Sequence, residues 1–168
     1  DVWFPHKAEI LLEEMKQLEA RLGADHPVLV HSDMEVVGPR LEQISPSFFA
    51  YAHCDPTRVT LPEILVENPV TGGALMMNRA LLNLVWTKPS VCYMHDWWIA
   101  LTASCFGTIR CVRRPLYQYR QHDRNLVGAT AIGSAGELAK RLHRQEEVGE
   151  NYRRMLAQAA AFGRMFRD

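Results

Sequence analysis

Apolar residues in the N-terminal part of the chain recur at the spacing of an amphipathic helix. Five of them fall on one helical face: Ile10, Leu11, Met15, Leu18 and Leu22. Pro5 suits the first turn of a helix, because its missing N–H has no intrahelical partner there, and Gly23 suits a C-cap. The pattern therefore predicts a helix over residues 5–22.

A short apolar segment after this helix is typical of a buried strand. Residues 28–37 are rich in β-branched side chains, and Gly38 and Pro39 end the segment. We expect this strand to pack on the helix at 5–22 and on the apolar side of a later helix at 96–105. Helices that interleave with a few short strands predict an α/β fold, in which helices cover a small mixed sheet.

The other segments predict shorter elements. Helices or helical turns are expected at residues 48–52, 61–67 and 78–85, and a strand or tight turn at 71–77. Two short strands around a turn are expected at 108–112 and 115–119, after a helix stop at Gly107. From residue 134 the pattern is helical to the end, with breaks near Gly149 and Gly163.

Composition and charge narrow the function classes. The 168 residues fit one domain, and the 19 Lys and Arg equal the 19 Asp and Glu, so no net field favours nucleic acid. No apolar run approaches the roughly 20 residues of a transmembrane span. The four cysteines lack Cys-x-x-Cys spacing and predict buried free thiols in a reducing compartment, so we expect a cytoplasmic protein.

Candidate chemistry is concentrated where the helix at 96–105 begins. The pair His95 and Asp96 stands directly before Trp97 and Trp98. A carboxylate at a helix start can act as a general base when its surroundings tune its affinity for protons. It can equally stabilise the helix dipole while the tryptophans fill the core.

A second polar cluster follows the predicted strand at 115–119. Arg120 can pair with a phosphate through two hydrogen bonds, and His122 can ligate a divalent metal, with Asn125 beside them. The same residues are also compatible with a solvated loop.

Two earlier stretches offer weaker candidates. Gly72 and Gly73 let backbone N–H groups approach a ligand and Thr71 can orient it, although a Gly-Gly pair is also common in ordinary turns. Asp33 lies in the later part of a predicted strand, where polar groups of an α/β sheet often face a site. A structural hydrogen-bonding role for Asp33 is equally compatible with the sequence.

Five motifs, taken in order, resemble the C-terminal half of bacterial family-2 glycosyltransferases, especially the rhamnosyltransferase-like members. They are Asp-Val-Trp-Phe-Pro-His-Lys at 1–7, Ser-Asp at 32–33, Asn-Pro-Val-Thr-Gly-Gly at 68–73 with Met-Asn-Arg at 77–79, His-Asp-Trp-Trp at 95–98, and Tyr-Arg-Gln-His-x-x-Asn-x-x-Gly at 119–128. The resemblance implies a partial GT-A fold. It assigns residues 1–130 to the acceptor and catalytic part, and residues 131–168 to a C-terminal helical extension.

The resemblance also implies an activity. Such enzymes transfer a sugar, here for example rhamnose, from a nucleotide-sugar donor with inversion at the anomeric carbon. The acceptor is a saccharide or lipid-linked molecule in cell-surface polysaccharide synthesis, which would bring the protein to the inner face of the membrane. A divalent ion, Mn or Mg, bridges the donor diphosphate in this family.

Individual residues carry these implied roles. Asp96 falls in the motif whose aspartate deprotonates the acceptor hydroxyl. His122, Arg120 and Asp1 fall where the donor diphosphate and the metal bind, with His122 as a metal ligand. The acceptor side is implied for five residues: Thr71, Gly72, His95, Trp97 and Trp98.

Family members also carry a nucleotide-binding half before the first motif, so the resemblance implies that Asp1 trails a carboxylate motif of that half. Without it, we expect exposed apolar surface and an open sheet edge, covered by upstream residues or by a second copy in a homodimer. The surface is expected from Leu11, Leu18, Leu22, residues 28–37 and Trp86.

Two other functions are compatible with the residues. One is a metal-dependent phosphohydrolase, which would be all-helical and would use His53, His95, Asp96 and Asp123. The other is a non-catalytic module that binds an acceptor or docks on a partner.

Overall fold

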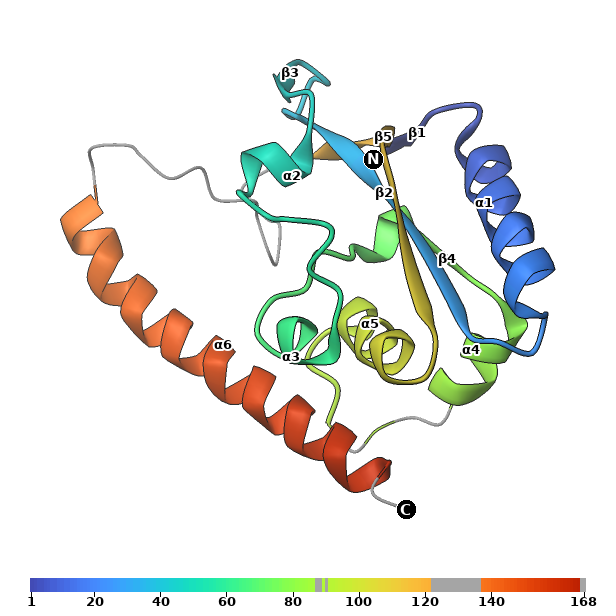
Figure 1. Cartoon of the computed structure of the whole chain (residues 1–168). Coiled ribbons are helices and arrows are strands. Elements are labelled where there is room, and N and C mark those ends of the chain that lie inside the picture. Colours follow the sequence, from blue (N-terminus) through green and yellow to red (C-terminus); the bar gives the residue numbers. More distant parts are fainter. Residues whose placement is uncertain (87–88, 90, 122–136, 167–168) are drawn as a thin grey trace.

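The strand predicted at residues 28–37 forms the centre of the sheet. The computed structural model describes residues 1–86, 89, 91–121 and 137–166, and in it β2 (Val28–Val37) is almost fully buried. On one side β2 pairs in parallel with β5 (Thr108–Arg120). On the other side it pairs antiparallel with β4 (Leu75–Met77) and β3 (Gln43–Ser45). The fold is therefore mixed α/β, as predicted (Figure 1).

The side chains of β2 alternate between helices on opposite faces of the sheet. Val28 and Val30 pack against α1 (Lys7–Leu22), in a cluster with Leu11, Met15 and Leu18. Leu29 points the other way and joins the cluster around α5 (His95–Phe106), which includes Trp98 and Leu101. Both packing contacts predicted for this strand are confirmed.

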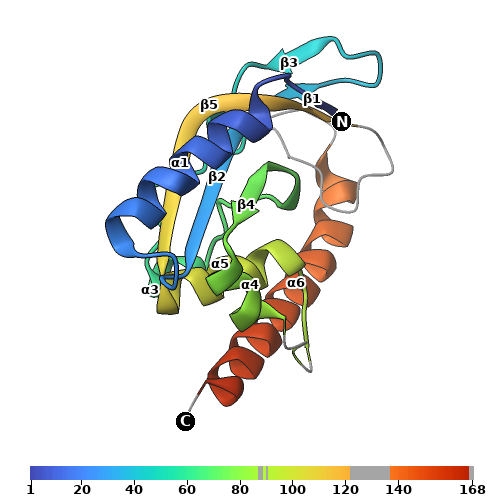
Figure 2. The same ribbon diagram turned by 90° about the vertical axis from the view of Figure 1, so that its right-hand side faces the viewer.

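The prediction of two strands around a turn at residues 108–119 is wrong, because β5 is one continuous strand. Val112 pairs with Ser32 and Pro115 pairs with Asp33, so Arg113 and Arg114 form a bulge inside the strand. A bulge tolerates a proline, which cannot donate to the ladder, and it bends the strand. Figure 2 shows this curvature of β5 over the sheet.

The C-terminal helix continues through both glycines at which breaks were predicted. α6 (Glu137–Met165) contains Gly149 and Gly163 without interruption, and a single helical glycine costs only about 1 kcal/mol. Near the end of α6, Phe162 packs against Trp98, and the centroids of the two rings lie 5.4 Å apart. Within the described residues, no helix combines the length and apolar character needed to cross a membrane.

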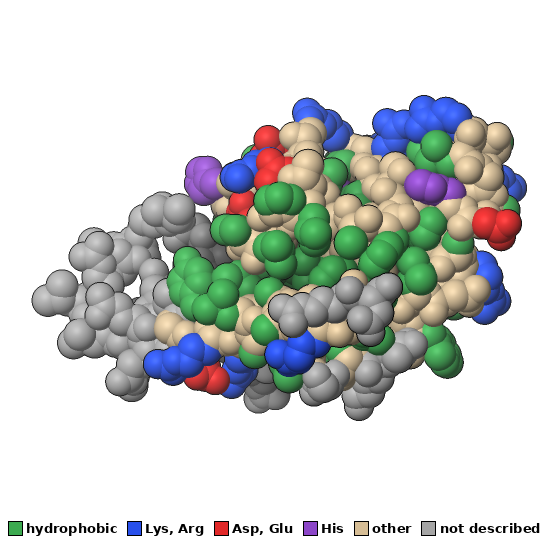
Figure 3. Space-filling view, turned by 60° about the horizontal axis from the view of Figure 1, so that its bottom comes forward, with side chains coloured by type: hydrophobic (Ala, Val, Ile, Leu, Met, Phe, Trp, Pro, Cys, Tyr) green, Lys and Arg blue, Asp and Glu red, His purple; other side chains and the backbone are tan. Residues whose placement is uncertain are grey.

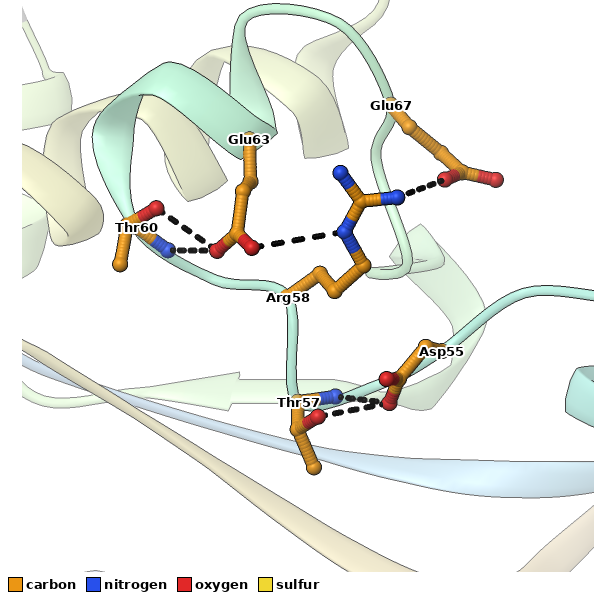
Figure 4. A network of polar contacts seen from close by, with 6 residues as sticks. All are labelled: Asp55, Thr57, Arg58, Thr60, Glu63 and Glu67. Atoms are coloured by element: carbon orange, nitrogen blue, oxygen red, sulfur yellow. Dashed lines mark hydrogen bonds and ion pairs between the residues drawn. The ribbon is translucent and has the colours of Figure 1, made fainter.

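The remaining helices are short. They are α2 (Phe48–Tyr51), α3 (Leu61–Ile64), the 3-10 helix η1 (Gly72–Ala74) and α4 (Arg79–Val85). Those at residues 48–51 and 79–85 lie where helical segments were predicted, the helix predicted at 61–67 ends at Ile64, and a 3-10 turn leads into β4 where a strand or tight turn was expected. α3 begins where the Glu63 carboxylate accepts hydrogen bonds from the hydroxyl and the N–H of Thr60 (Figure 4). The hydroxyl bond is the main reason why the pKa of Glu63 is lowered.

Asn78 fastens the turn before α4 to the centre of the sheet. Its Oδ1 accepts from the N–H groups of Val28 and Leu81, each at 3.0 Å. Its Nδ2 donates to the carbonyl of His26 and to Glu19. Since every polar atom of this buried amide is satisfied, Asn78 has a structural role that accounts for its place in the third motif.

The expected surplus of apolar surface is only partly present. Leu11 and Leu18 are each 2% exposed and β2 is covered, so these residues do not belong to an open face. Trp86, in contrast, is 79% exposed. Figure 3 shows hydrophobic side chains gathered on the side of the molecule that lies at the bottom of Figure 1.

The four cysteines form no disulfide, as predicted, but contrary to the prediction none of them is fully buried. Cys92 and Cys105 are exposed, whereas Cys54 and Cys111 are half-buried. Burial is the main cause that raises the pKa of the Cys54 and Cys111 thiols to about 11, so both are protonated at neutral pH.

Candidate functional site

Asp96 lies at the start of α5 with its carboxylate held in one orientation. The residue is 5% exposed. Its Oδ2 accepts a hydrogen bond from the backbone N–H of Gly72 at 2.9 Å, and its Oδ1 accepts from the N–H of Trp97 at 2.7 Å. Each carboxylate oxygen can accept two hydrogen bonds, so one acceptor position on each oxygen remains for a ligand.

The Gly72–Gly73 pair allows a turn to pass directly over this helix start. A Cβ on Gly72 would lie 2.5 Å from Nε2 of His95 and 3.6 Å from Oδ2 of Asp96. A Cβ on Gly73 would lie 2.8 Å from the hydroxyl of Tyr117. The glycines are thus required by close approach to neighbouring side chains.

Thr71 begins this turn with a buried hydroxyl. Its Oγ1 has no hydrogen-bond partner among the residues that the structure describes. A buried hydroxyl without a partner costs free energy, so it is available to a ligand group that reaches the turn. Thr71, Gly72, His95 and Asp96 therefore lie close together, and the family resemblance had implied one site for them.

Lys7 is a residue of this site that the sequence did not reveal. It is 3% exposed, and its ammonium group donates a hydrogen bond to the carbonyl of Gly73. The ammonium nitrogen lies 3.8 Å from the ring centroid of Trp3 and 4.7 Å from that of Tyr117. Burial lowers the pKa of Lys7, while the two ring faces favour its charged form.

Tyr117 closes the site from the side of β5. Burial is the main cause that raises the pKa of its phenol above the usual range. The negative charges of Tyr119 and Asp96 raise this pKa further. The hydroxyl of Tyr117 is therefore protonated at neutral pH and remains a hydrogen-bond donor.

Asp1 and Arg120 meet at the end of β5. Oδ1 of Asp1 accepts a hydrogen bond from the backbone N–H of Arg120 at 3.0 Å. β1 (Val2–Trp3) pairs with Gln118 and Tyr117, so the Asp1–Arg120 pair and the Gly72–Gly73 turn both lie along this end of β5.

The two tryptophans do not form an open wall. Trp98 is 3% exposed and packs against Phe162, so it fills the core and cannot contact an acceptor, contrary to the role implied for it. Trp97 is half-buried, and its indole N–H donates to the carbonyl of Ile64 at 2.5 Å. His95 is exposed beside the Gly72–Gly73 turn and remains a candidate for the acceptor side.

Asp33 has a structural hydrogen-bonding role, which was the alternative to a place in the functional site. Its Oδ1 accepts from the N–H groups of Phe48 and Phe49, and its Oδ2 accepts from the hydroxyl of Ser47 at 2.6 Å. These bonds hold the start of α2 against the sheet.

His31 is buried in β2 without a polar partner. It is 0% exposed, and neither ring nitrogen has a hydrogen-bond partner among the described residues. Burial lowers its pKa to about 4, against 6.5 in an unfolded chain. Below pH 6.5 the unfolded state therefore binds a proton at His31 that the folded state does not bind. The free energy of unfolding consequently falls as the pH falls towards 4.

We expect His31→Leu to remove part of this pH dependence. Between pH 7.5 and 5 the free energy of unfolding of the unmodified chain should drop by about 2 kcal/mol from His31 alone. Urea denaturation of both proteins at the two pH values measures the difference, with the exposed His6→Asn as control. An equal pH dependence in His31→Leu and the unmodified chain would contradict the assignment.

Several predicted residues lie outside the described part of the chain. These are His122, Asn125 and Asp123. In the described ranges, no group of three or more His, Cys, Asp or Glu side chains is arranged to hold a metal ion. Of the residues predicted to bind an Mn or Mg ion, Asp1 alone therefore lies in the described part of the chain.

The arrangement around Asp96 can accept a proton from a bound hydroxyl group. It combines the fixed carboxylate of Asp96, the Gly72–Gly73 turn and the Thr71 hydroxyl, which has no partner among the described residues.

Comparisons of the chain with protein-family models, with curated protein sequences and with solved structures give no match.

Proposed function

We propose that the chain is the acceptor-binding and catalytic part of an inverting family-2 glycosyltransferase with a GT-A fold, and that Asp96 is its general base. The placement of Asp96 carries the proposal. A general base must present a fixed oxygen within hydrogen-bond reach of the proton that it removes. Two backbone N–H groups fix the carboxylate, and Gly72 lets the turn approach it closely.

In the proposed reaction an acceptor hydroxyl binds between Asp96 and Thr71. Its proton passes to the Asp96 carboxylate while its oxygen forms a bond to the anomeric carbon of the donor sugar. The bond from that carbon to the diphosphate breaks on the opposite face, and the nucleoside diphosphate leaves with the electron pair. Attack opposite the leaving group inverts the configuration.

The donor diphosphate is assigned to the end of β5. Asp1 and Arg120 are in contact there, and His122 follows in the sequence. A guanidinium group suits a phosphate because it can form two parallel hydrogen bonds. A bound divalent ion would supply charge neutralisation at the leaving group, with Asp1 and His122 as its candidate ligands.

The phosphohydrolase alternative is not favoured by the structure. It requires an all-helical fold, whereas the described residues contain a five-stranded sheet. It also gives no role to the turn that holds Asp96. The binding-module alternative makes the same acceptor contacts and differs only in lacking transfer.

The decisive experiment measures donor binding and transfer in parallel. Uridine and thymidine diphosphate sugars are titrated calorimetrically with and without manganese, on this chain and on a version extended upstream of Asp1. We expect metal-dependent donor binding and transfer to a saccharide acceptor by the extended protein. Acceptor binding without transfer would establish the binding module, and phosphate release from monoesters would revive the phosphohydrolase.

One substitution separates the donor side from the acceptor side. We expect His122→Ala to weaken metal-dependent donor binding more than acceptor binding, because His122 is assigned to the diphosphate and metal. The same titrations measure both affinities. The opposite pattern would move this residue to the acceptor side.

A further inference from the structure

A chain of hydrogen bonds connects Lys7 with Asp96 through two peptide groups. The Lys7 ammonium donates to the carbonyl of Gly73. The N–H of the same peptide group, which belongs to Ala74, donates to the carbonyl of Thr71 at 2.9 Å. The N–H of that second peptide group belongs to Gly72 and donates to Asp96 at 2.9 Å.

All three hydrogen bonds run in the same direction, from a cation to a carboxylate. Successive hydrogen bonds of this kind polarise one another, so a positive charge at one end strengthens the donor at the other. The effect is largest where water is excluded, and both Lys7 and Asp96 are at most 5% exposed.

Burying a lysine is costly unless its ammonium has partners. The partners of Lys7 are the Gly73 carbonyl and the faces of Trp3 and Tyr117, and none of them is a carboxylate. Among the described residues no carboxylate therefore forms an ion pair with Lys7, and its field acts along the peptide groups towards Asp96.

We propose that Lys7 is a positioning residue, which orients the Asp96 carboxylate through the peptide groups 73–74 and 71–72. The proposal rests on the proposed function for its catalytic consequence, while the hydrogen-bond relay itself is a property of the folded chain. The two parts can therefore be tested separately.

The relay is tested by NMR on this chain, independently of any activity. Lys7→Met keeps the length of the side chain and removes its charge. We expect the amide proton signals of Gly72 and Ala74 to move upfield, as their hydrogen bonds weaken. Lys7→Arg should retain most of the original shifts, and Lys16→Met, at an exposed position of the same helix, should leave both signals unchanged.

A measurement without substitution covers the case in which Lys7→Met does not fold. In the unmodified chain, the same two amide signals should move together as Lys7 is deprotonated at high pH, below the usual 10.5 because burial lowers its pKa. Signals of Gly72 and Ala74 that are unaffected by Lys7→Met, or by this titration, would overturn the relay.

The catalytic consequence is tested in the transfer assay. We expect Lys7→Met to lower kcat by about ten-fold or more, with little change in acceptor KM, and Lys7→Arg to restore most of it. The acid limb of the pH–rate profile should also move to higher pH. Altered amide signals with unchanged kcat and profile would refute the positioning role, whereas absent transfer in the unmodified extended protein would refute the proposed function alone.

Discussion

Asp96→Asn is expected to reduce the rate of sugar transfer by about 10²–10⁴-fold, the range that a general base contributes. Asparagine keeps the size of the side chain, and its carbonyl can still accept from Gly72 or Trp97. It cannot accept the proton of an acceptor hydroxyl. Steady-state kinetics on the extended protein give kcat, and calorimetry gives the donor affinity, which should stay nearly unchanged.

The matched control is Asp25→Asn, at an exposed position away from the Gly72–Gly73 turn. Because the asparagine amide turns an N–H donor towards one of two backbone N–H groups, we also expect a stability loss of about 1 kcal/mol. Thermal unfolding separates this loss from the kinetic effect. Near-normal turnover of Asp96→Asn would assign the general base to another residue.

Gly107→Val is expected to have the largest effect on stability of any single substitution considered. A Cβ on Gly107 would lie 2.1 Å from the backbone carbonyl oxygen of Pro27, which no side-chain rearrangement can relieve. That carbonyl accepts the first hydrogen bond between β2 and β5, from the N–H of Thr108 at 2.9 Å. Relief of the clash therefore has to open the parallel pair at its start.

We expect the cost to exceed about 3 kcal/mol, the upper end of ordinary overpacking, because backbone has to move. Urea denaturation measures it. Gly163→Ala is the control, since nothing lies within 4 Å of a Cβ at that helical position and alanine favours helix by about 1 kcal/mol. If Gly107→Val unfolds at the same urea concentration as the unmodified chain, the close approach to Pro27 is absent in solution.

The elements that the sequence predicted well are those with uninterrupted patterns. α1 and β2 carry regular apolar spacing, and Gly107 ends α5 where a stop was expected. The errors occurred where a local signal competes with tertiary structure. Pro115 signals a turn, yet pairing with β2 turns the same segment into a bulge.

The candidate site was predictable only in part. The contact between Asp96 and the Gly72–Gly73 turn joins two motifs whose proximity the resemblance implied, and the residue types were informative. Lys7 was missed because a lysine in the first turn of an amphipathic helix is ordinarily exposed. Its burial depends on β1, a two-residue strand that pairs with β5 and carries Trp3.

The parallel pairing of β2 with β5 has a consequence for synthesis on the ribosome. The paired residues, from Val28 with Thr108 to Val37 with Arg120, are roughly 80 positions apart in the chain. The buried central strand of the sheet therefore emerges long before its main partner is translated. The helices that cover both faces of β2, and the strands β3 and β4 that pair with its other edge, precede β5 in the chain, so only the edge that pairs with β5 waits for it. Until β5 is translated, this open edge can pair with another chain, and it is a ready substrate for chaperones that bind extended segments.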